Sequence, residues 1–276
     1  MGGNGLAYFR ALKPGTWRNQ MTQEKSGVGK VALITGASSG IGQAAAIELA
    51  RCGYQIAIHY HTNEKGARQT LERIRSLKNA RARAYSFDVS NPAEAGQVAG
   101  DILEDFGRID VLVNNAGGML QRLALAEMDF ERWRQTIAVN LDSVFLVTRA
   151  FLPCMIQQRS GCIINVCSLA ARTGGGPGSG AYAAAKGGVL ALTKAMAKEF
   201  IHHGIRVNCV NPGLIDTPFH ENLTTREMMD SFISAVPQGR CGSGNEVAKV
   251  IAFLASDDAS FMLGECVEVN GGMLMD

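Results

Sequence analysis

The chain has 276 residues, which is enough for one large core and ordinary for a single α/β domain. Hydrophobic residues make up 46% of it and charged residues 19%, a balance typical of soluble globular proteins. The formal net charge is +2, and no run of lysines and arginines gives an electrostatic reason to bind nucleic acid. Since no stretch approaches the ~18 or more uninterrupted apolar residues of a membrane span, we expect neither a nucleic-acid partner nor a membrane.

The amino-terminal end differs in composition from the rest of the chain. Residues 1–29 are Gly-rich and irregular, and they lack the apolar segment of a secretory signal. We predict that they form a disordered extension and that the folded domain spans 30–276. Met21 is a candidate for the natural start.

Seven cysteines are scattered along the chain without a C-x-x-C pair, and several lie in apolar segments. This pattern favours reduced thiols and a cytoplasmic location over disulfides or a zinc site. His59 and His61 suggest a metal, but no Cys, Asp or Glu stands at ligand spacing. Alternation at the end of a strand is the simpler interpretation of the two histidines, and no metal is expected.

The first predicted strand, Lys30–Thr35, runs into a Gly-rich turn, and helical composition follows over Gln43–Cys52. Glycines let the backbone approach a pyrophosphate, whose charge is received by the N–H groups and positive dipole end of the next helix. The G-x-x-x-G-x-G spacing departs from the usual G-x-G-x-x-G, and a tight strand–helix turn is the alternative. The predicted cofactor contacts in this turn are Gly36, Ser38, Ser39, Gly40, Ile41 and Gly42.

The second predicted strand, Gln55–Tyr60, ends where a dinucleotide fold meets the adenosine ribose. An acidic residue there would repel a 2′-phosphate, but no carboxylate follows the strand before Glu64. This favours NADP(H), with NAD(H) as the alternative because the glycine turn holds no cation and Lys65 or Arg51 would have to reach in. The expected contacts at this strand end are Tyr60, His61 and Thr62.

The next strands place polar and small residues at the same edge of the sheet. A predicted strand over Ala82–Val89 puts Asp88 either on an adenine amino group or in a turn, and spacing alone leaves both open. Ile109–Val113 is strand-like and breaks into Asn114–Gly118, whose small residues leave room for a cofactor.

A long helix is expected over Phe130–Phe151, with Asn140 inside it. Because an amide is a poor interior helix residue, Asn140 either faces solvent or bonds to a group that compensates its burial. The following strand, Cys162–Val166, delivers Ser168, and the Gly-rich loop Thr173–Gly180 resembles a mobile wall.

Tyr182 and Lys186 lie four positions apart in a run of strong helix formers, so their side chains point into the same space. A phenol titrates near pH ~10, and a cation a few ångströms away favours the phenolate and lowers that pKa. We therefore predict a tuned acid/base pair. For the pair taken alone, a half-buried Tyr beside a solvated Lys is the alternative.

The remaining segments complete an alternation of strands and helices. Ile205–Val210 is a predicted strand, and we expect a lid helix within Glu221–Ser234, a last helix over Glu246–Ser256 and a last strand over Cys266–Val269. Such alternation predicts a single α/β domain with a Rossmann-type doubly wound parallel sheet of about seven strands and helices on both faces. The expected substrate-pocket residues outside the lid are Arg172, Leu214, Phe219 and His220.

Several motifs occur in a fixed order along the chain. They are Thr35-Gly36-x-x-x-Gly40-x-Gly42, Asn114-Asn115-Ala116-Gly117, Asn140, Ser168, Tyr182-x-x-x-Lys186 and Pro212-Gly213. The ordered set resembles the short-chain dehydrogenase/reductase family, and within it the 3-oxoacyl-carrier-protein-reductase-like branch. Two departures are visible: the Ser168-to-Tyr182 interval is one residue longer than in many relatives, and Asn270 replaces a common Asp.

The resemblance implies a role for each motif. Tyr182 would exchange the proton, Lys186 would lower the Tyr182 pKa and hold the nicotinamide ribose, and Ser168 would bind the substrate oxygen. Asn140 would hold a water that links Lys186 to solvent. The other implied cofactor contacts are Asp88 and Val89 at the adenine, Asn115, Ala116 and Gly117 at the cofactor's middle, Ile215 and Thr217 at the carboxamide, and also Pro212 and Gly213.

The resemblance also implies the reaction, an NAD(P)-dependent hydride transfer that interconverts a small-molecule ketone or 3-oxoacyl group and a secondary alcohol. A sugar or polyol dehydrogenase is the alternative substrate class. A catalytically silent NAD(P)-binding sensor or scaffold is the alternative of another kind. Family members are usually tetramers, and we expect a homotetramer with contacts from the helices Phe130–Phe151 and Tyr182–His203.

Overall fold

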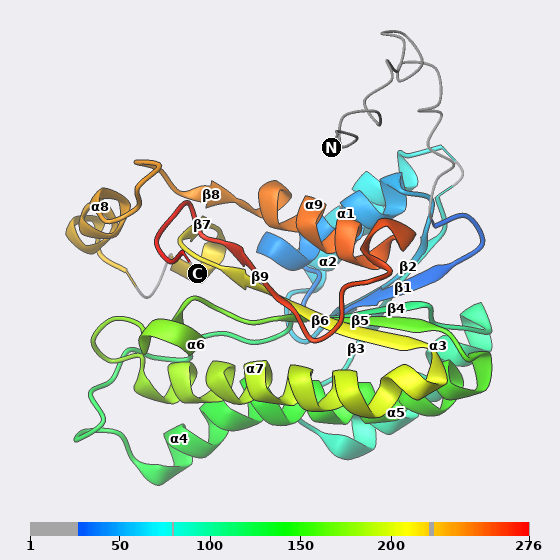
Figure 1. The fold of residues 1–276 in the computed structure, drawn as a ribbon, viewed down its shortest axis with the longest axis horizontal. Coiled ribbons are helices and arrows are strands. Elements are labelled where there is room, and N and C mark those ends of the chain that lie inside the picture. Colours follow the sequence, from blue (N-terminus) through cyan, green and yellow to red (C-terminus); the bar gives the residue numbers. More distant parts are fainter. Residues whose placement is uncertain (1–26, 79, 221–223, 276) are drawn as a thin grey trace, which may run out of the picture.

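The structure, a computed structural model, describes residues 27–78, 80–220 and 224–275. Its centre is a seven-stranded parallel sheet in the order β3-β2-β1-β4-β5-β6-β9 (Figure 1). The strands are β1 (Val31–Ile34), β2 (Gln55–Tyr60), β3 (Ala82–Ser86), β4 (Val111–Asn114), β5 (Gly161–Val166), β6 (Ile205–Pro212) and β9 (Cys266–Val269). The predicted doubly wound α/β fold is confirmed. The predicted extension, up to residue 26 and with Met21, lies outside the described residues.

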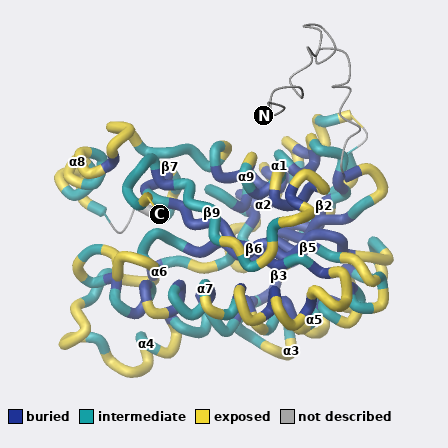
Figure 2. The backbone as a smooth tube through the Cα atoms, in the orientation of Figure 1, coloured by how far each residue is buried: buried dark blue, intermediate teal, exposed yellow. Residues whose placement is uncertain are grey.

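Helices cover both faces of this sheet (Figure 1). One layer consists of α1 (Gly40–Arg51), α2 (Glu64–Arg75) and α9 (Gly244–Ala255). The other consists of α3 (Pro92–Phe106), α5 (Ser143–Gln158) and α7 (Gly180–Phe200), with α4 (Phe130–Ile137) packed against α7. The strands between the two layers form the buried centre of the molecule (Figure 2).

The strand β1 shows how one run of apolar residues serves two cores. Successive strand side chains point to opposite faces, so Ile34 joins the core under α1, α2 and α9, while Leu33 joins the core under α3, α5 and α7. Both side chains are fully buried. A strand buried on both faces is apolar throughout, which explains why the sequence marks it so clearly.

The position of β1 in the sheet also creates the binding crevice. Strand β1 pairs with β2 on one side and with β4 on the other, so the strand order reverses between β1 and β4. Connections leaving the carboxyl ends of these two strands diverge to opposite sides of the sheet. In open α/β sheets, ligands bind at this point.

The long helix expected over Phe130–Phe151 is interrupted. Helix α4 ends at Ile137, residues Ala138–Asp142 form a π-helical turn that contains Asn140, and α5 continues to Gln158. Among the described residues, the combined segment is the one helix that is long and apolar enough to cross a membrane. That test is also passed by core helices of soluble proteins, and this one packs against β4 and β5.

A smaller element was not predicted from the sequence. Strands β7 (Ile215–Asp216) and β8 (Gly242–Ser243) form a two-stranded parallel sheet beside the crevice. Between them lies α8 (Arg226–Ser234), the described part of the expected lid helix, while residues 221–223 of that expectation lie outside the described residues. No α8 residue is buried, in contrast to the helices of the two layers.

Candidate active site

A cavity of about 700 Å³ opens at the carboxyl ends of the strands. Most of the residues predicted to bind cofactor or to catalyse line it. They are Gly36, Ser38, Ser39, Gly40, Ile41, His61, Thr62, Asp88, Val89, Asn115, Ala116, Gly117, Ser168, Tyr182, Lys186, Pro212, Gly213, Ile215 and Thr217. Three predicted residues lie outside the described lining: Gly42 packs behind the glycine turn, Tyr60 packs on the core, and Asn140 is fully buried.

The glycine turn after β1 forms a cradle that side chains would obstruct. Gly36 has a φ of +65° and Gly40 one of +54°, both in the left-handed region that favours glycine. A Cβ at Gly42 would collide with the carbonyl oxygen of Gly36 and would lie 2.5 Å from Nδ2 of Asn115. Helix α1 begins at Gly40, so its free N–H groups and positive dipole end face the cavity. The donors and the space fit a pyrophosphate.

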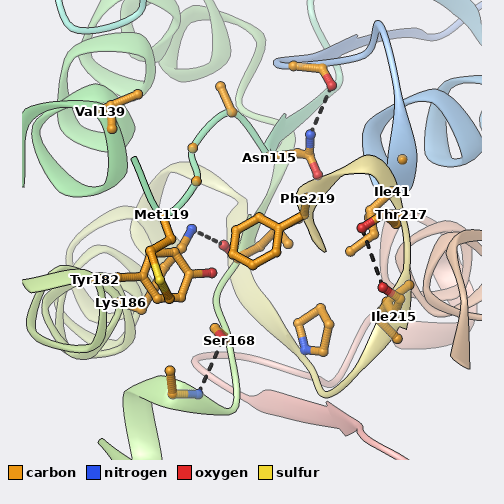
Figure 3. A pocket seen from close by; sticks show the side chains of 18 of the residues that line it. Ile41, Asn115, Met119, Val139, Ser168, Tyr182, Lys186, Ile215, Thr217 and Phe219 are labelled. Atoms are coloured by element: carbon orange, nitrogen blue, oxygen red, sulfur yellow. Dashed lines mark hydrogen bonds between the residues drawn. The ribbon is translucent and has the colours of Figure 1, made fainter. Parts of the chain in front are cut away.

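Hydrogen bonds fasten the ends of β1 and β4 together beneath this cradle. The Asn115 amide Nδ2 donates to the carbonyl oxygens of Thr35 (2.9 Å) and Gly36 (3.2 Å). The hydroxyl of Thr35 accepts from the backbone N–H groups of Asn115 and Ala116, both at 2.9 Å. Figure 3 shows Asn115 at the edge of the cavity making one of these bonds. The switch point is therefore rigid before any ligand binds.

A buried histidine continues the same network toward β3. The N–H of Gly36 donates to Nδ1 of His59 at 3.0 Å, so Nε2 carries the proton and donates to the carbonyl oxygen of Phe87 at 2.9 Å. Burial lowers the pKa of His59 to about 4, which keeps the ring neutral at pH 7. His59 therefore has a structural role, because its two hydrogen bonds tie the glycine turn to the end of β3. Among the described residues no cluster of His, Cys, Asp or Glu suits a metal ion.

The adenosine end of the cavity is lined by His61, Thr62 and Asn63. None of these carries a carboxylate. Neither Arg51 nor Lys65, the cations that were expected to reach in, belongs to the described lining, and Arg51 instead pairs with Glu48 at 3.1 Å. A 2′-phosphate at this end would therefore meet no carboxylate from these three residues.

Asp88 performs the turn role and also lines the cavity. Its Oδ1 accepts from the backbone N–H of Ser90 at 2.8 Å and from the Ser90 hydroxyl at 2.7 Å. These bonds hold the end of β3 in place and use one carboxylate oxygen. The two interpretations of Asp88 left open by the sequence are therefore compatible.

Tyr182, Ser168 and Lys186 meet at the other end of the cavity (Figure 3). The side chains of Tyr182 and Ser168 both line this end of the cavity, and Ser168 lies close enough to Tyr182 to act on its pKa. The Lys186 ammonium is buried, donates to the carbonyl oxygen of Val166 at 2.8 Å and lies 5.8 Å from the centroid of the Tyr182 ring. Helix α7 presents Tyr182 and Lys186, and the segment after β5 presents Ser168, so two elements converge.

The expected lowering of the Tyr182 pKa by Lys186 is not found in this structure. Burial raises the pKa of Tyr182 to about 12, and the nearby Ser168 hydroxyl only partly opposes this. Burial also lowers the pKa of Lys186. The ammonium of Lys186 donates to Val166 and not to the phenol oxygen, so removal of the phenol from water dominates its pKa. Tyr182 is thus a protonated phenol at neutral pH.

Asn140 bonds to the backbone that follows β4. Its Nδ2 donates to the carbonyl oxygens of Gly118 and Thr136, each at 2.9 Å, and its Oδ1 accepts from the N–H of Gly118 at 2.9 Å. This pairing compensates the burial of the amide and confirms one of the two options from the sequence. Gly117 has a φ of +147°, and a Cβ there would lie 2.6 Å from Oδ1 of Asn140. The amide therefore fixes the cavity wall.

The substrate side of the cavity is mostly apolar. Phe219 lies beside Tyr182 with ring centroids 5.9 Å apart, and Met119 lies near both (Figure 3). Leu214 and Phe219 line it as expected, the side chain of His220 lies outside the described residues, and Arg172 is absent from the described lining and pairs with Glu268 at 3.3 Å. Phe232, which also lines the cavity, belongs to the expected lid segment, whereas no local sequence pattern marked Met119, Arg122 or Met273.

The fold and the site together define a dinucleotide-dependent oxidoreductase of the doubly wound α/β class. Comparison with known proteins agrees. Residues 36–274 match a family model described as enoyl-(acyl carrier protein) reductase. The chain therefore belongs to the short-chain dehydrogenase/reductase family, as the ordered motifs indicated.

Named relatives give a finer picture of the similarity. The chain is 38% identical over 246 residues to the 3-oxoacyl-[acyl-carrier-protein] reductase FabG of Staphylococcus epidermidis, with 89% of this chain and 99% of that protein covered. It is 40% identical over 247 residues to FabG of Escherichia coli, covering 90% and 98%. Among solved structures, levodione reductase superposes with a TM-score of 0.85 at 34% identity, covering 89% and 98%, and gox2181 with 0.85 at 31%, covering 91% and 98%.

Proposed function

We propose that the protein reduces 3-oxoacyl-type ketones to secondary alcohols with NADP(H) as the hydride source. The observation that carries the proposal is the meeting of the Ser168 and Tyr182 side chains in the same cavity as the glycine turn. Two hydroxyls side by side suit a carbonyl oxygen, which accepts two hydrogen bonds. The names of the relatives favour a 3-oxoacyl substrate over a sugar or polyol.

The residues present fit an extended dinucleotide. The glycine cradle and the start of α1 would hold the pyrophosphate, Asp88 and Val89 the adenine, and Ile215 with Thr217 the carboxamide. When bound, the nicotinamide supplies the hydride. Lack of an acid after β2 supports NADP(H), since a carboxylate there would repel the 2′-phosphate.

Side chains of the protein would bind the carbonyl oxygen of the substrate and supply the proton. Ser168 would donate to the substrate carbonyl oxygen and hold it against Tyr182. Because the raised pKa keeps the phenol protonated at neutral pH, Tyr182 has a proton to deliver to that oxygen as negative charge develops on it. Lys186 would stabilise the resulting phenolate, and Asn140 would keep the wall at Gly117 and Gly118 in position.

Steady-state assays with matched thioesters test this proposal. Purified protein is given NADPH and either a short 3-oxoacyl thioester or the 2-enoyl thioester of equal chain length. We expect NADPH to be consumed with the ketone and not with the enoyl compound, and kcat/KM to be higher with NADPH than with NADH. Turnover of the enoyl thioester alone would contradict the proposed reaction. Tight NADPH binding without turnover across a broad carbonyl panel would favour a sensor or scaffold.

We further propose a homotetramer in the cytoplasm. Exposed apolar side chains occur on two separate faces: Phe130 and Phe145 on the α4–α5 side, and Phe253 and Phe261 on the α9–β9 side. Two apolar faces support two kinds of two-fold contact, which together generate a tetramer. Cys162, Cys167 and Cys209 are buried as thiols without a disulfide, which supports a reducing compartment. Light scattering at micromolar concentration measures the assembly.

A further inference from the structure

Three cysteines gather on one face of the sheet, near the strand β9. Cys209 on β6 and Cys266 on β9 are directly paired in the parallel register of these strands, so their side chains point to the same face. Asn165 is the partner of Cys209 on β5, and Cys167 follows it by two positions, which returns to that face. The three cysteines lie in one apolar cluster covered by α5 and α7.

The three thiols differ in their access to solvent. Cys209 is fully buried and Cys167 is 3% exposed, whereas Cys266 is partly exposed. In the described part of the sheet β9 pairs with β6 alone, so Cys266 lies on an edge strand. Cys167 lines the active-site cavity, but Cys209 and Cys266 do not belong to its described lining. A small molecule in the surrounding water therefore reaches the Cys209–Cys266 pair through Cys266.

The spacing of parallel strands suits a disulfide between Cys209 and Cys266. Neighbouring strands lie about 4.8 Å apart, and a disulfide joins residues whose Cα atoms are usually about 4.4–6.8 Å apart. Cys167 is displaced from the register partner of Cys209 by two residues, about 6.6 Å along the strand, so its Cα lies about 8 Å from that of Cys209. That distance is outside the range of a disulfide. Both Cys209 and Cys266 are free thiols in this structure, and the register selects them as the pair that can join.

The two thiols of the pair also differ in acidity. The neighbouring Cys209 thiol lowers the pKa of Cys266. Arg172 acts in the same direction, while burial and the carboxylates of Glu265 and Glu268 oppose it. The pKa of Cys209 is raised by the neighbouring Cys266 and by burial. Because the thiolate is the nucleophilic form of cysteine, Cys266 is the sulfur that reacts first and Cys209 the one that follows.

We propose that Cys266 and Cys209 form a reversible oxidation site that reacts with a hydroperoxide and ends as a disulfide between β9 and β6. The Cys266 sulfur attacks one peroxide oxygen, the O–O bond breaks, and the leaving oxygen takes the proton of the Cys266 thiol, which leaves a sulfenic acid on Cys266. The Cys209 sulfur then attacks the Cys266 sulfur, the S–O bond breaks, and the hydroxyl departs as water with the Cys209 proton. The two sulfurs are oxidised by two electrons in total and the peroxide is reduced, and a dithiol reductant reverses the change by thiol–disulfide exchange.

The disulfide would close a loop that contains α8, the exposed wall of the substrate side. Strands β7 and β8 and the helices α8 and α9 all lie between Cys209 and Cys266 along the chain. A cross-link across so long a segment restricts the unfolded chain, and more so than one across a short loop. We therefore expect oxidation to raise the Tm of the protein by about 5–15 °C.

Controlled oxidation of the purified full-length chain tests the pair. The protein is treated with a slight excess of hydrogen peroxide, the remaining thiols are alkylated, and mass spectrometry of a non-reducing digest maps the bonds. We expect the loss of two of the seven thiols, one peptide pair joined through Cys209 and Cys266, and recovery of all seven with dithiothreitol. The rise in Tm should appear and disappear with the bond. A disulfide through Cys167, a bond between two protomers, or equal oxidation of all the thiols would overturn the proposal.

Single variants separate the roles of the two sulfurs. Cys209→Ala leaves the sulfenic acid of Cys266 without a partner, so dimedone should trap it there. Cys266→Ser removes the attacking sulfur and should abolish both the sulfenic acid and the disulfide. Because Cys266 is only partly buried, this second variant keeps the proposal testable if Cys209→Ala fails to fold. Cys154→Ser, a change at a partly buried thiol on α5, is the matched control and should leave the disulfide unaltered. A disulfide that still forms at Cys209 in Cys266→Ser would refute the pair.

Discussion

The two ends of the cavity are built in different ways. At the cofactor end, Thr35, Gly36, His59 and Asn115 bond to one another through short contacts between backbone and buried side chains. At the substrate end, the Gly-rich loop and α8 are held by contacts such as those of Arg122, and no residue of α8 is buried. Figure 2 shows α8 largely exposed beside a buried sheet.

This difference reflects the two kinds of ligand. The chemical structure of the cofactor's pyrophosphate and nicotinamide does not vary, so a rigid, preorganised network can bind them at low entropic cost. A substrate must enter and leave, so its walls come from segments of low local stability. The boundary between the two regions passes through Tyr182 and Ser168, which in the proposed reaction would serve both ligands. Substitutions on either side of them test this boundary.

Replacement of Tyr182 by Phe removes the proposed proton donor. We expect kcat to fall by about 10³- to 10⁴-fold, since a positioned acid contributes about that much, while the Kd of NADPH stays unchanged. Initial-rate assays and fluorescence titration measure the two quantities. Tyr85→Phe is the matched control, because the Tyr85 hydroxyl bonds to Asp105 away from the cavity. Activity retained in Tyr182→Phe would refute the assignment of the acid.

His59 makes the cofactor end sensitive to acid. Its pKa is about 4 in the folded protein against 6.5 for a histidine exposed to water, so the unfolded chain binds the proton first as pH falls. The contribution of neutral His59 to the free energy of unfolding is therefore complete above pH ~6.5. It is lost progressively toward pH ~4, a change of about 3 kcal/mol. Urea unfolding at several pH values measures it. His59→Asn should flatten this dependence, and the exposed His202→Asn should not; equal slopes in both would contradict the role.

Gly42→Ala tests the close packing behind the cradle. The added methyl collides with the Gly36 carbonyl, and overpacking of this kind costs about 1–3 kcal/mol. We expect the Kd of NADPH to rise by about 5- to 100-fold, with KM for the ketone little changed at saturating cofactor. Gly100→Ala in α3 is the control, since its methyl meets nothing within 4 Å. Unaltered NADPH binding in Gly42→Ala would show that the turn shifts to accommodate the methyl group more easily than its contacts suggest.

Two helix caps allow a direct comparison of the core with α8, and their removal has the smallest expected effect. The Ser243 hydroxyl caps α9 and the Thr225 hydroxyl caps α8, each accepting from a backbone N–H at 3.3 Å. Ser243→Ala should lower the global free energy of unfolding by about 1 kcal/mol, because α9 is part of the core. Thr225→Ala should leave it unchanged and only speed hydrogen exchange within α8. Equal global losses would show that α8 unfolds together with the core.

The strands and the glycine turn could be predicted from the sequence for a physical reason. Buried parallel strands are continuously apolar, and a turn that needs left-handed backbone must contain glycine at Gly36 and Gly40, so both leave a local signature. Tyr182 and Lys186 are visible because helix geometry fixes their relative position.

The features that the sequence did not predict depend on contacts between distant segments. Arg122 meets Pro177 and Phe232 only after the chain has folded, and no local pattern marks that meeting. The pKa of Tyr182 was predicted in the wrong direction, because spacing along a helix reveals a neighbouring charge but not the burial that outweighs it. The two-residue strands β7 and β8 are too short for an alternation of apolar and polar residues to appear in the sequence.

The π-helical turn at Ala138–Asp142 has a consequence for insertions and deletions. Such a turn is equivalent to one extra residue accommodated within an α-helix. Removing one residue between Ala138 and Asp142 would restore regular α-helical pairing and keep α4 and α5 in phase, but it would abolish the wider turn that carries Asn140. Asn140 would then lose the position from which it bonds to Gly118. A length change of a single residue is therefore tolerated in the surface loops of this molecule but not here.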